Sequence, residues 1–176
     1  MIITETAEIE INGVREVREA VFSPDKIYRY RLDICWDTGL PTLATVGLNP
    51  STATHLKDDP TIRRGKGFAK RYGCGSYRML NAFAYRSTDY KALFRVADPV
   101  GPENTIEFLN FWLDGTVGIA CWGAHITERQ WRHYYRGHYL SDAFPSLKCF
   151  RKTKSGHPEH PLYLPADLKP IPFQYD

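Results

Sequence analysis

The sequence predicts a three-layer α/β fold, in which helices cover both faces of a central, mostly parallel sheet. Short apolar runs alternate with amphipathic segments along the 176 residues, and this strand–helix–strand order is typical of parallel sheets. Two of the runs, 41–48 and 116–121, are almost wholly apolar or β-branched, as expected of strands buried on both faces. The hydrophobic content of 43% is sufficient for one packed core at this length.

Within one domain spanning residues 1–176, residues 1–26 predict an N-terminal β-hairpin extension. Polar and apolar residues alternate on both sides of Asn12-Gly13, and this dipeptide is the strongest short signal for a tight hairpin turn. A further alternating run, 28–36, predicts the strand that follows the hairpin.

The rest of the chain alternates strands and helices. The strand over 41–48 ends before Pro50, because proline cannot continue a hydrogen-bonded ladder. Asp59-Pro60 has the pattern of an N-cap followed by proline in the first helical turn, which predicts a helix to about Tyr72. The pattern then predicts a strand over 76–83, a short helix over 88–94, an amphipathic helix over 103–113, a strand over 116–121, a basic aromatic helix over 126–139 and a strand over 147–150.

Composition narrows the class of protein. No apolar run approaches the ~20 residues of a membrane helix, and the N-terminus lacks the basic and apolar regions of a secretory signal, so we expect a cytoplasmic protein. Four scattered cysteines without a CxxC pair argue against disulfides, zinc and iron–sulfur clusters. Residues 1–25 hold six acids and two bases, so 21 of the 23 bases and 14 of the 20 acids lie in 26–176. This basic excess favours polyanionic partners, although solubility alone can explain it.

Polar segments follow the predicted strands at their carboxyl ends, the edge where parallel sheets bind ligands. These segments are 49–51, Asn81, Trp122-Gly123 and, less directly, 157–160. Their convergence predicts a pocket built around the loop Gly47-Leu48-Asn49-Pro50-Ser51. Taken singly, Asn49 also fits an Asx-type turn, and Asn81 a cap for backbone groups at the end of a strand.

The polar residues of this edge suit recognition of a base and of a developing anion. The amide of Asn49 or Asn81 offers a donor and an acceptor in one plane, as a nucleobase edge does. A neutral imidazole at His160 can donate a hydrogen bond to a carbonyl oxygen or a developing negative charge. The structural alternative for each histidine is a hydrogen bond to the backbone, and the spacing of His157 and His160 is poor evidence for zinc.

Two groups of charged residues are further candidates. The predicted helix has basic residues that can contact a phosphate backbone, although most basic helices are only solvated. They are Arg63, Arg64 and Lys66. His55, Asp58 and Asp59 form a candidate acid–base cluster, although Asp59 is more simply a helix cap. The sequence lacks a phosphate-binding glycine loop, GxSxG and HExxH, which excludes several large enzyme classes.

Four segments, in the same order, resemble the motifs of uracil-DNA glycosylases. They are Gly47-Leu48-Asn49-Pro50-Ser51, Leu80-Asn81-Ala82-Phe83, Cys121-Trp122-Gly123 and His160-Pro161. The resemblance spans roughly residues 41–164. More closely, the pattern resembles a bacterial and phage family of domains of unknown function with LNPS, DDPTIRR, DPVGP and HPLY signatures.

The resemblance implies a glycosylase-like fold and hydrolysis of a base from DNA or a related nucleoside, without metal or cofactor. Asn49 would position the attacking water, and His160 would stabilise negative charge on the departing base. Asn81 would recognise the base edge, and the target base would leave the duplex to reach the pocket. The residues implied in base or substrate binding are Gly47, Leu48, Pro50, Ser51, Phe68 (as a stacking ring), Asn81, Trp122, Gly123 and Pro161.

Two other functions remain open at this point. One is a non-catalytic nucleic-acid or nucleotide-binding module of the same fold, and the other is a nucleotide-processing hydrolase that uses His55, Asp58 and Asp59. In all three cases the expected partner is DNA or a nucleotide-like ligand, with no membrane involved. The second motif also departs from the glycosylases, since it continues as Leu162-Tyr163 instead of a serine-containing segment.

Overall fold

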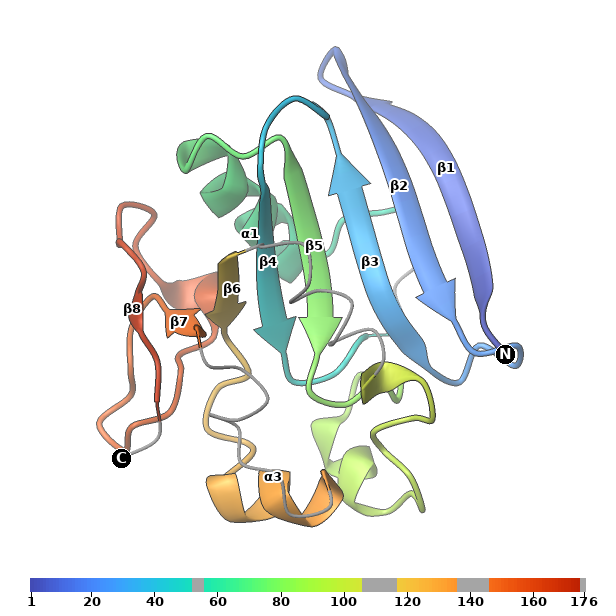
Figure 1. Ribbon diagram of the computed structural model, residues 1–176, viewed down its shortest axis with the longest axis vertical. Coiled ribbons are helices and arrows are strands. Elements are labelled where there is room, and N and C mark those ends of the chain that lie inside the picture. The colour runs from blue at the N-terminus through green and yellow to red at the C-terminus, as the bar shows by residue number, and fades with distance from the viewer. Residues whose placement is uncertain (52–55, 106–116, 136–145, 175–176) are drawn as a thin grey trace.

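The apolar runs of the sequence pair into one eight-stranded sheet with the order β1-β2-β3-β5-β4-β6-β7-β8 (Figure 1). The computed structural model describes residues 1–51, 56–105, 117–135 and 146–174. The strands are β1 (Ile3–Ile11), β2 (Val14–Phe22), β3 (Arg29–Cys35), β4 (Thr42–Gly47), β5 (Ser76–Asn81), β6 (Val117–Ala120), β7 (Lys148–Cys149) and β8 (Ile171–Pro172). The helices whose bounds are described are α1 (Pro60–Arg71), α3 (Glu128–Tyr134) and the 3-10 helices η1 (Tyr90–Phe94) and η2 (Pro161–Tyr163).

The sheet is mixed, so the prediction of a three-layer α/β/α fold around a mostly parallel sheet is wrong, and with it the glycosylase-like architecture. Only the pairs β4–β5, β4–β6 and β6–β7 are parallel within the described residues. The pairs β1–β2, β2–β3, β3–β5 and β7–β8 are antiparallel, and α1 and α3 are short, with 12 and 7 residues. The error has a physical cause, because the alternation of a strand specifies its buried face and not the direction of its neighbour.

The hairpin predicted at Asn12-Gly13 is present. β1 and β2 pair antiparallel around this turn, where the two residues have positive φ angles of 51° and 76°. Such a turn matches the right-handed twist of the flanking strands. Because β2 also pairs with β3, the hairpin continues the main sheet.

The predicted helix after Asp59-Pro60 is α1, and its local signals act as expected. The Asp59 carboxylate accepts a hydrogen bond from the backbone N–H of Ile62 at 2.8 Å, and Gly73 follows the helix with a φ of 68°. The runs 28–36, 41–48, 76–83, 116–121 and 147–150 contain β3, β4, β5, β6 and β7, respectively. β8 was not predicted, because two residues including a proline show no periodicity.

The other helix predictions are confirmed only where the structure describes them. The run 88–94 contains η1, which is a 3-10 helix capped by Asp89. The helix predicted over 126–139 is represented by α3, which begins with a capping box between Thr127 and Gln130, and the end of the predicted segment lies outside the described residues. The helix predicted over 103–113 also lies mostly outside them.

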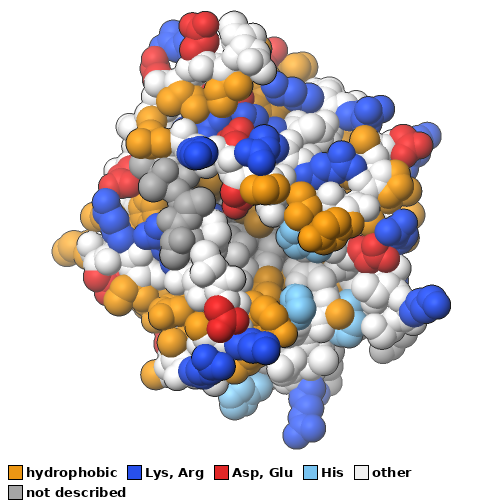
Figure 2. Space-filling view, turned by 180° about the vertical axis from the view of Figure 1, so that it is seen from behind, with side chains coloured by type: hydrophobic (Ala, Val, Ile, Leu, Met, Phe, Trp, Pro, Cys, Tyr) orange, Lys and Arg blue, Asp and Glu red, His pale blue; other side chains and the backbone are white. Residues whose placement is uncertain are grey.

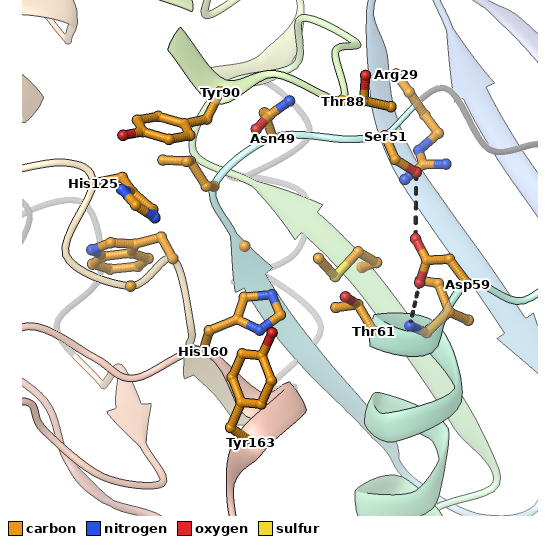
Figure 3. Close-up of a pocket in the computed structure, with 16 residues that line it drawn as sticks. Arg29, Asn49, Ser51, Asp59, Thr61, Thr88, Tyr90, His125, His160 and Tyr163 are labelled. Carbon is orange, nitrogen blue, oxygen red and sulfur yellow. Dashed lines mark hydrogen bonds between the residues drawn. The ribbon is translucent and has the colours of Figure 1, made fainter.

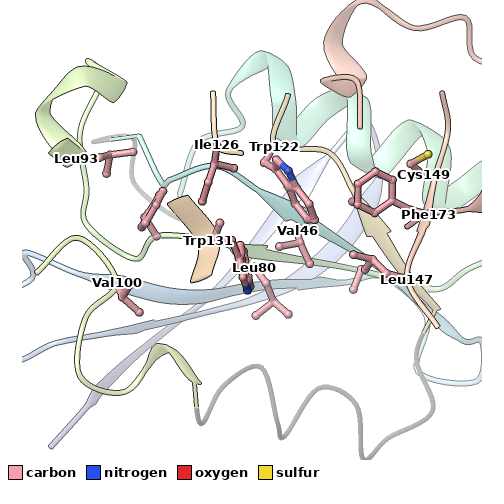
Figure 4. Close-up of a cluster of buried hydrophobic side chains, with 14 residues drawn as sticks. Val46, Leu80, Leu93, Val100, Trp122, Ile126, Trp131, Leu147, Cys149 and Phe173 are labelled. Carbon is pink, nitrogen blue, oxygen red and sulfur yellow. The ribbon is translucent and has the colours of Figure 1, made fainter. Parts of the chain in front are cut away.

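Alternate residues of the central strands point to opposite faces of the sheet, and each face has a hydrophobic core. In β4, Leu43 belongs to one core, whereas Ala44 and Val46 belong to the other. Residues of α1 pack into the Leu43 core. On the Val46 face, the rings of Trp122 and Trp131 stack with centroids 5.9 Å apart (Figure 4). β4 is therefore held on both faces up to the point where its carboxyl end opens into a pocket.

Gly65 allows α1 to lie close to the sheet. A Cβ at this position would lie 2.2 Å from Cζ of Tyr77, and that ring is fully buried, with its hydroxyl 2.6 Å from Oγ1 of Thr45. We expect Gly65→Ala to lower the free energy of unfolding by ~1–3 kcal/mol, because the helix or the ring must move. Urea denaturation followed by circular dichroism measures this change.

Gly67, two residues along the same helix, provides the matched control. It is exposed, and a Cβ there would meet no atom within 4 Å. Gly67→Ala should therefore raise the free energy of unfolding by ~0.5–1 kcal/mol through helix propensity alone. Equal effects of the two substitutions would contradict the close approach of α1 to Tyr77.

Candidate functional site

A pocket of about 330 Å³ opens beyond the carboxyl ends of β4 and β6, a volume at the lower end of the range for small-molecule sites. The face of the molecule seen in Figure 2 is hollowed near its centre, with histidine and hydrophobic side chains at the hollow and Lys and Arg side chains around it. The predicted residues that line the pocket are Gly47, Leu48, Asn49, Ser51, Asp59, Trp122, Gly123 and His160. Figure 3 shows how several of them converge from different segments.

Parallel pairing brings the strand ends to one level. Gly47 of β4 lies beside Asn81 of β5, and Val46 lies beside Ala120 of β6. The pairing continues past the end of β5. The N–H of Ala82 donates to the carbonyl oxygen of Gly47 at 2.8 Å, and the N–H of Phe83 donates to that of Leu48 at 2.9 Å. The loop after β4 therefore begins at a fixed position beside the β5 end.

The Asn49 side chain both ties this loop down and faces the pocket. Its Nδ2 donates to the carbonyl oxygens of Ser87, Pro50 and Tyr85 at 2.8, 3.1 and 3.5 Å. These bonds fix the orientation of the amide, because a flipped amide would place oxygen against oxygen. Oδ1 accepts no hydrogen bond from the described residues, so it is the atom that remains for a ligand or water. Asn49 is therefore a structural residue of the loop that also borders the pocket.

Asn81 lies behind the pocket, next to Gly47. Its side chain is 1% exposed, and neither Nδ2 nor Oδ1 has a hydrogen-bond partner in the described protein. A Cβ at position 47 would lie 2.9 Å from Oδ1 of Asn81 and 2.5 Å from Cε of Met79, so glycine alone leaves room for this arrangement. A buried amide without a partner costs ~1–3 kcal/mol. Asn81 is not among the residues that line the pocket, so a ligand would reach its amide only past Gly47.

His160 lines the pocket from the other side, and a hydrogen bond between its ring and the backbone of Leu162 defines its tautomer. Nδ1 accepts a hydrogen bond from the N–H of Leu162 at 3.3 Å, so in the neutral ring the proton resides on Nε2. Burial lowers the pKa of His160, against an opposing effect of Asp59 and with a smaller lowering effect of His125. At neutral pH this imidazole is therefore a neutral hydrogen-bond donor that projects towards the pocket (Figure 3).

Aromatic side chains form much of the remaining wall. The rings of Tyr90 and His125 lie 4.1 Å apart between centroids, with a tilt of 30°, and the buried Trp122 lines the pocket beside them. Tyr163 lies at the rim on η2 and is 83% exposed. Flat apolar rings of this kind suit a planar ligand, because they offer a large contact area at low entropic cost.

Several predicted binding residues have structural contacts outside the pocket lining. Phe68 is 2% exposed and stacks on Phe150 with centroids 4.0 Å apart. The Arg64 guanidinium lies over the Phe68 ring at 5.0 Å and donates to the carbonyl oxygens of Pro161 and Leu164. Arg64 thus holds the segment that follows His160, and its guanidinium is used inside the protein.

The remaining predicted residues are placed as follows. Pro50 and Pro161 are buried and do not line the pocket. Arg63 is exposed and donates to the carbonyl oxygen of Asp58 at 2.7 Å. Whether Arg63 contacts a phosphate in a complex stays a prediction.

Lys66 belongs to a buried cluster of four charges that the sequence did not indicate. Its Nζ lies 2.5 Å from Glu16 and 2.8 Å from Asp58, while Arg18 pairs with the same two carboxylates at 2.6 and 2.8 Å. Glu16 and Arg18 are each 1% exposed. Two acids and two bases make the cluster neutral, and it joins β2 to α1 and to the segment before it.

The ion pairs of Asp58 separate it from Asp59, its neighbour in the candidate acid–base cluster. Burial raises the pKa of the Asp58 carboxyl, but its hydrogen bonds with Lys66 and Arg18 outweigh burial and lower the pKa. Asp59 lines the pocket, where its two oxygens accept from the Ile62 N–H and, at 3.3 Å, from the Ser51 hydroxyl. His55 lies outside the described residues. Of these three residues, the structure therefore places Asp59 at the pocket.

The pocket also contains functional candidates that the sequence did not reveal. They are Arg29, Thr61, Thr88, Tyr90, His125 and Tyr163. Arg29 begins β3, Thr88 and His125 lie in loops, and Thr61, Tyr90 and Tyr163 lie in α1, η1 and η2, respectively. For Tyr163 a signal was available, since it directly follows the His160 motif.

Neither a metal cluster nor a membrane-spanning helix is found in the part of the chain that the structure describes. There, no group of three or more His, Cys, Asp or Glu side chains is arranged to hold a metal ion. No helix of that part is long and apolar enough to cross a bilayer.

Fold and pocket together define a protein with a mixed eight-stranded sheet, short helices and a pocket at the carboxyl ends of its parallel strands. The chain belongs to the family described as "Protein of unknown function (DUF1643)", whose model matches residues 29–162. This confirms the expected membership of a family of unknown function, although the match names neither the four signatures nor a bacterial or phage source. No curated protein matches the chain, so the resemblance to glycosylases rests on the motifs alone.

The charge cluster yields a prediction about stability. Lys66→Met would leave Glu16 and Asp58 with Arg18 as their single cation, so we expect the free energy of unfolding to fall by ~3–5 kcal/mol. Arg71→Met, at an exposed position of the same helix, should change it by about 0.5 kcal/mol or less. Urea denaturation of both variants measures the effects, and a small loss for Lys66→Met would mean that the cluster is not maintained in solution.

Proposed function

We propose that the chain hydrolyses the N-glycosidic bond of a base in DNA or in a related nucleoside bound in this pocket. One observation carries the proposal: Oδ1 of Asn49 and Nε2 of His160, an acceptor and a donor, border the same pocket. Hydrolysis requires an oriented water at the sugar carbon and a donor at the departing base. These two side chains are suited to those tasks.

Asn49 acts on the water. Its Oδ1 accepts a hydrogen bond from the water and orients an oxygen lone pair towards C1′, while the three carbonyl contacts of Nδ2 hold the amide in place. An amide is not a base, so it does not remove a proton before attack. The C1′–N bond therefore breaks early, the water oxygen bonds to C1′, and one water proton is released as the base becomes protonated. Catalysis depends on stabilising a cationic sugar and an anionic base.

His160 acts on the departing base. In the tautomer that Leu162 imposes, Nε2–H donates to an oxygen of the base as negative charge develops. The lowered pKa keeps the ring neutral near pH 7, so the donor is present without a second proton on the ring.

The surroundings of Gly47 and the aromatic wall support a planar, polar-edged ligand. Asn81 offers an unpaired buried donor and acceptor behind Gly47, which matches the edge of a base. Tyr90, His125 and Trp122 provide ring surfaces beside it.

A second candidate is a nucleotide-binding module without catalysis. The internal contacts of Arg64 and Lys66 favour it, because they reduce the number of cations available on α1 for a DNA backbone. The hydrolase that uses Asp58 is disfavoured, since this carboxylate is engaged with Arg18 and Lys66.

Substitution of the two pocket residues tests the proposed reaction. Asn49→Ala and His160→Gln should each lower the rate of base release by about 10²- to 10³-fold, the usual loss on removing one group that stabilises the transition state. The assay uses duplex and single-stranded oligonucleotides with uracil, mismatched and modified bases, together with free nucleosides and their 5′-monophosphates, and detects abasic sites or free base. Arg71→Met is the control, and circular dichroism verifies the fold of each variant. Lack of product from every substrate would refute hydrolysis and leave the binding module.

The pH dependence of the rate provides an independent test. His160 has a lowered pKa, so the neutral donor persists below pH 6.5, its ordinary midpoint. As the pH falls through the lowered pKa, Nδ1 gains a proton and can no longer accept from Leu162, so the rate should fall. By linkage, the stabilisation from this group is complete above the unfolded pKa and is lost as the pH falls towards the folded pKa. Single-turnover rates from pH 4 to 9 measure this fall of the rate at low pH. The His160→Gln variant should not show it.

A further inference from the structure

Arg29 is a buried cation in the pocket wall that the proposed chemistry does not use. It is the first residue of β3, its side chain is 4% exposed, and its backbone N–H donates to the carbonyl oxygen of Ala84 at 2.9 Å. Figure 3 shows Arg29, Ser51 and Thr88 towards one end of the pocket, and His160 and Tyr163 towards the other. The pocket thus has a cationic, hydroxyl-bearing end and an aromatic end.

The Arg29 end retains its positive charge at neutral pH. Burial lowers the pKa of the guanidinium to about 10, and repulsion from Arg86 adds to this effect, so the group remains protonated at pH 7. Asp59 is the acidic side chain among the described residues of the lining. Its two oxygens already accept hydrogen bonds from Ile62 and Ser51. Asp59 therefore offsets part of the charge of Arg29 while its hydrogen bonds serve the start of α1.

The chemistry of this end suits a phosphate group. A guanidinium presents a planar fork of donors that matches two phosphate oxygens. The hydroxyl groups of Thr61 and Thr88 line the same pocket and can donate to the remaining oxygens. The Ser51 hydroxyl, which donates to Asp59 at 3.3 Å, can do so by turning from Asp59 to the phosphate. The N-terminal turn of α1, a 12-residue helix, also borders this end and adds a partial positive charge.

We propose that Arg29, with Ser51 and Thr88, binds the phosphate of a free nucleoside 5′-monophosphate, so that the substrate of this site is a mononucleotide. This inference rests on the proposed function, since it names the substrate class of the same pocket. The burial of Arg29 favours a free nucleotide over DNA. A phosphate within a DNA strand is bonded to two sugars and therefore remains with the strand outside the pocket. A terminal 5′-phosphate is bonded to one sugar and can enter the pocket together with its nucleoside. Water then adds OH to C1′ and a proton to the base, releasing the base and a sugar 5-phosphate.

Matched ligand pairs test this assignment. Isothermal titration calorimetry compares each deoxynucleoside with its own 5′-monophosphate, for uracil, thymine, cytosine, adenine and guanine, and with a single-stranded oligonucleotide containing that base. For at least one base the monophosphate should bind about tenfold tighter or more than the nucleoside, and tighter than the oligonucleotide. In Arg29→Gln this preference should disappear, whereas Arg71→Met should retain it.

The outcomes separate this inference from the proposed reaction. Equal affinity of nucleoside and monophosphate for the wild-type protein, tighter binding of the oligonucleotide, or an unchanged preference in folded Arg29→Gln would each overturn the phosphate assignment. If Arg29→Gln does not fold, Thr88→Val should reduce the preference at least about threefold by removing one donor, and no reduction would count against the assignment. Base release from DNA without a phosphate preference would leave the proposed hydrolysis intact. A phosphate preference without base release would instead support the binding module with this ligand class.

Discussion

The parallel pairing of β4 with β5 on one side and β6 on the other is the constraint on which the pocket depends. It places Gly47 beside Asn81, and it carries the chain after β6 to Trp122 at the same edge. Cores on both faces hold β4 in this position, so the loop beyond it departs from a rigid base. Proline at position 50 then ends the ladder, and the hydrogen bonds from Asn49 to the carbonyl oxygens of Tyr85 and Ser87 fasten the loop to the segment 85–87. An amide held in this way keeps one polar atom directed to the pocket at little entropic cost.

The buried charge cluster of Glu16, Arg18, Asp58 and Lys66 fixes the opposite wall of the pocket, which carries Asp59 and Thr61. Asp58 and Asp59 are neighbours in sequence but have different tasks, because Asp58 pairs with Arg18 and Lys66 while Asp59 caps α1 and lines the pocket. A buried neutral cluster adds little net stability compared with an apolar core. It does impose one orientation, since each carboxylate must meet both cations. The start of α1 is thereby positioned relative to β2, and with it the wall that carries Asp59 and Thr61.

What the sequence could predict was local. The Asn12-Gly13 turn and the Asp59 cap depend on neighbouring residues, and both are present. The rule that ligands bind at the ends of parallel strands correctly predicts that Asn49 and His160 line the same pocket. The direction of β3 beside β5 is a non-local choice that alternation does not specify. For the same reason Lys66 resembled its exposed neighbours on the helix, since its burial depends on Glu16, fifty residues earlier.

The strand whose direction the fold prediction missed also supplies the cation that the site prediction missed, and the two errors have one cause. β3 runs antiparallel to β5, with Leu32 opposite Met79. Its first residue, Arg29, therefore lies towards the carboxyl end of β5, at the edge where Gly47 and Asn81 lie. In a wholly parallel sheet the start of β3 would lie at the opposite edge, and its arginine could not reach the pocket. The mixed topology is thus what allows a strand start, as well as strand ends, to contribute to this site.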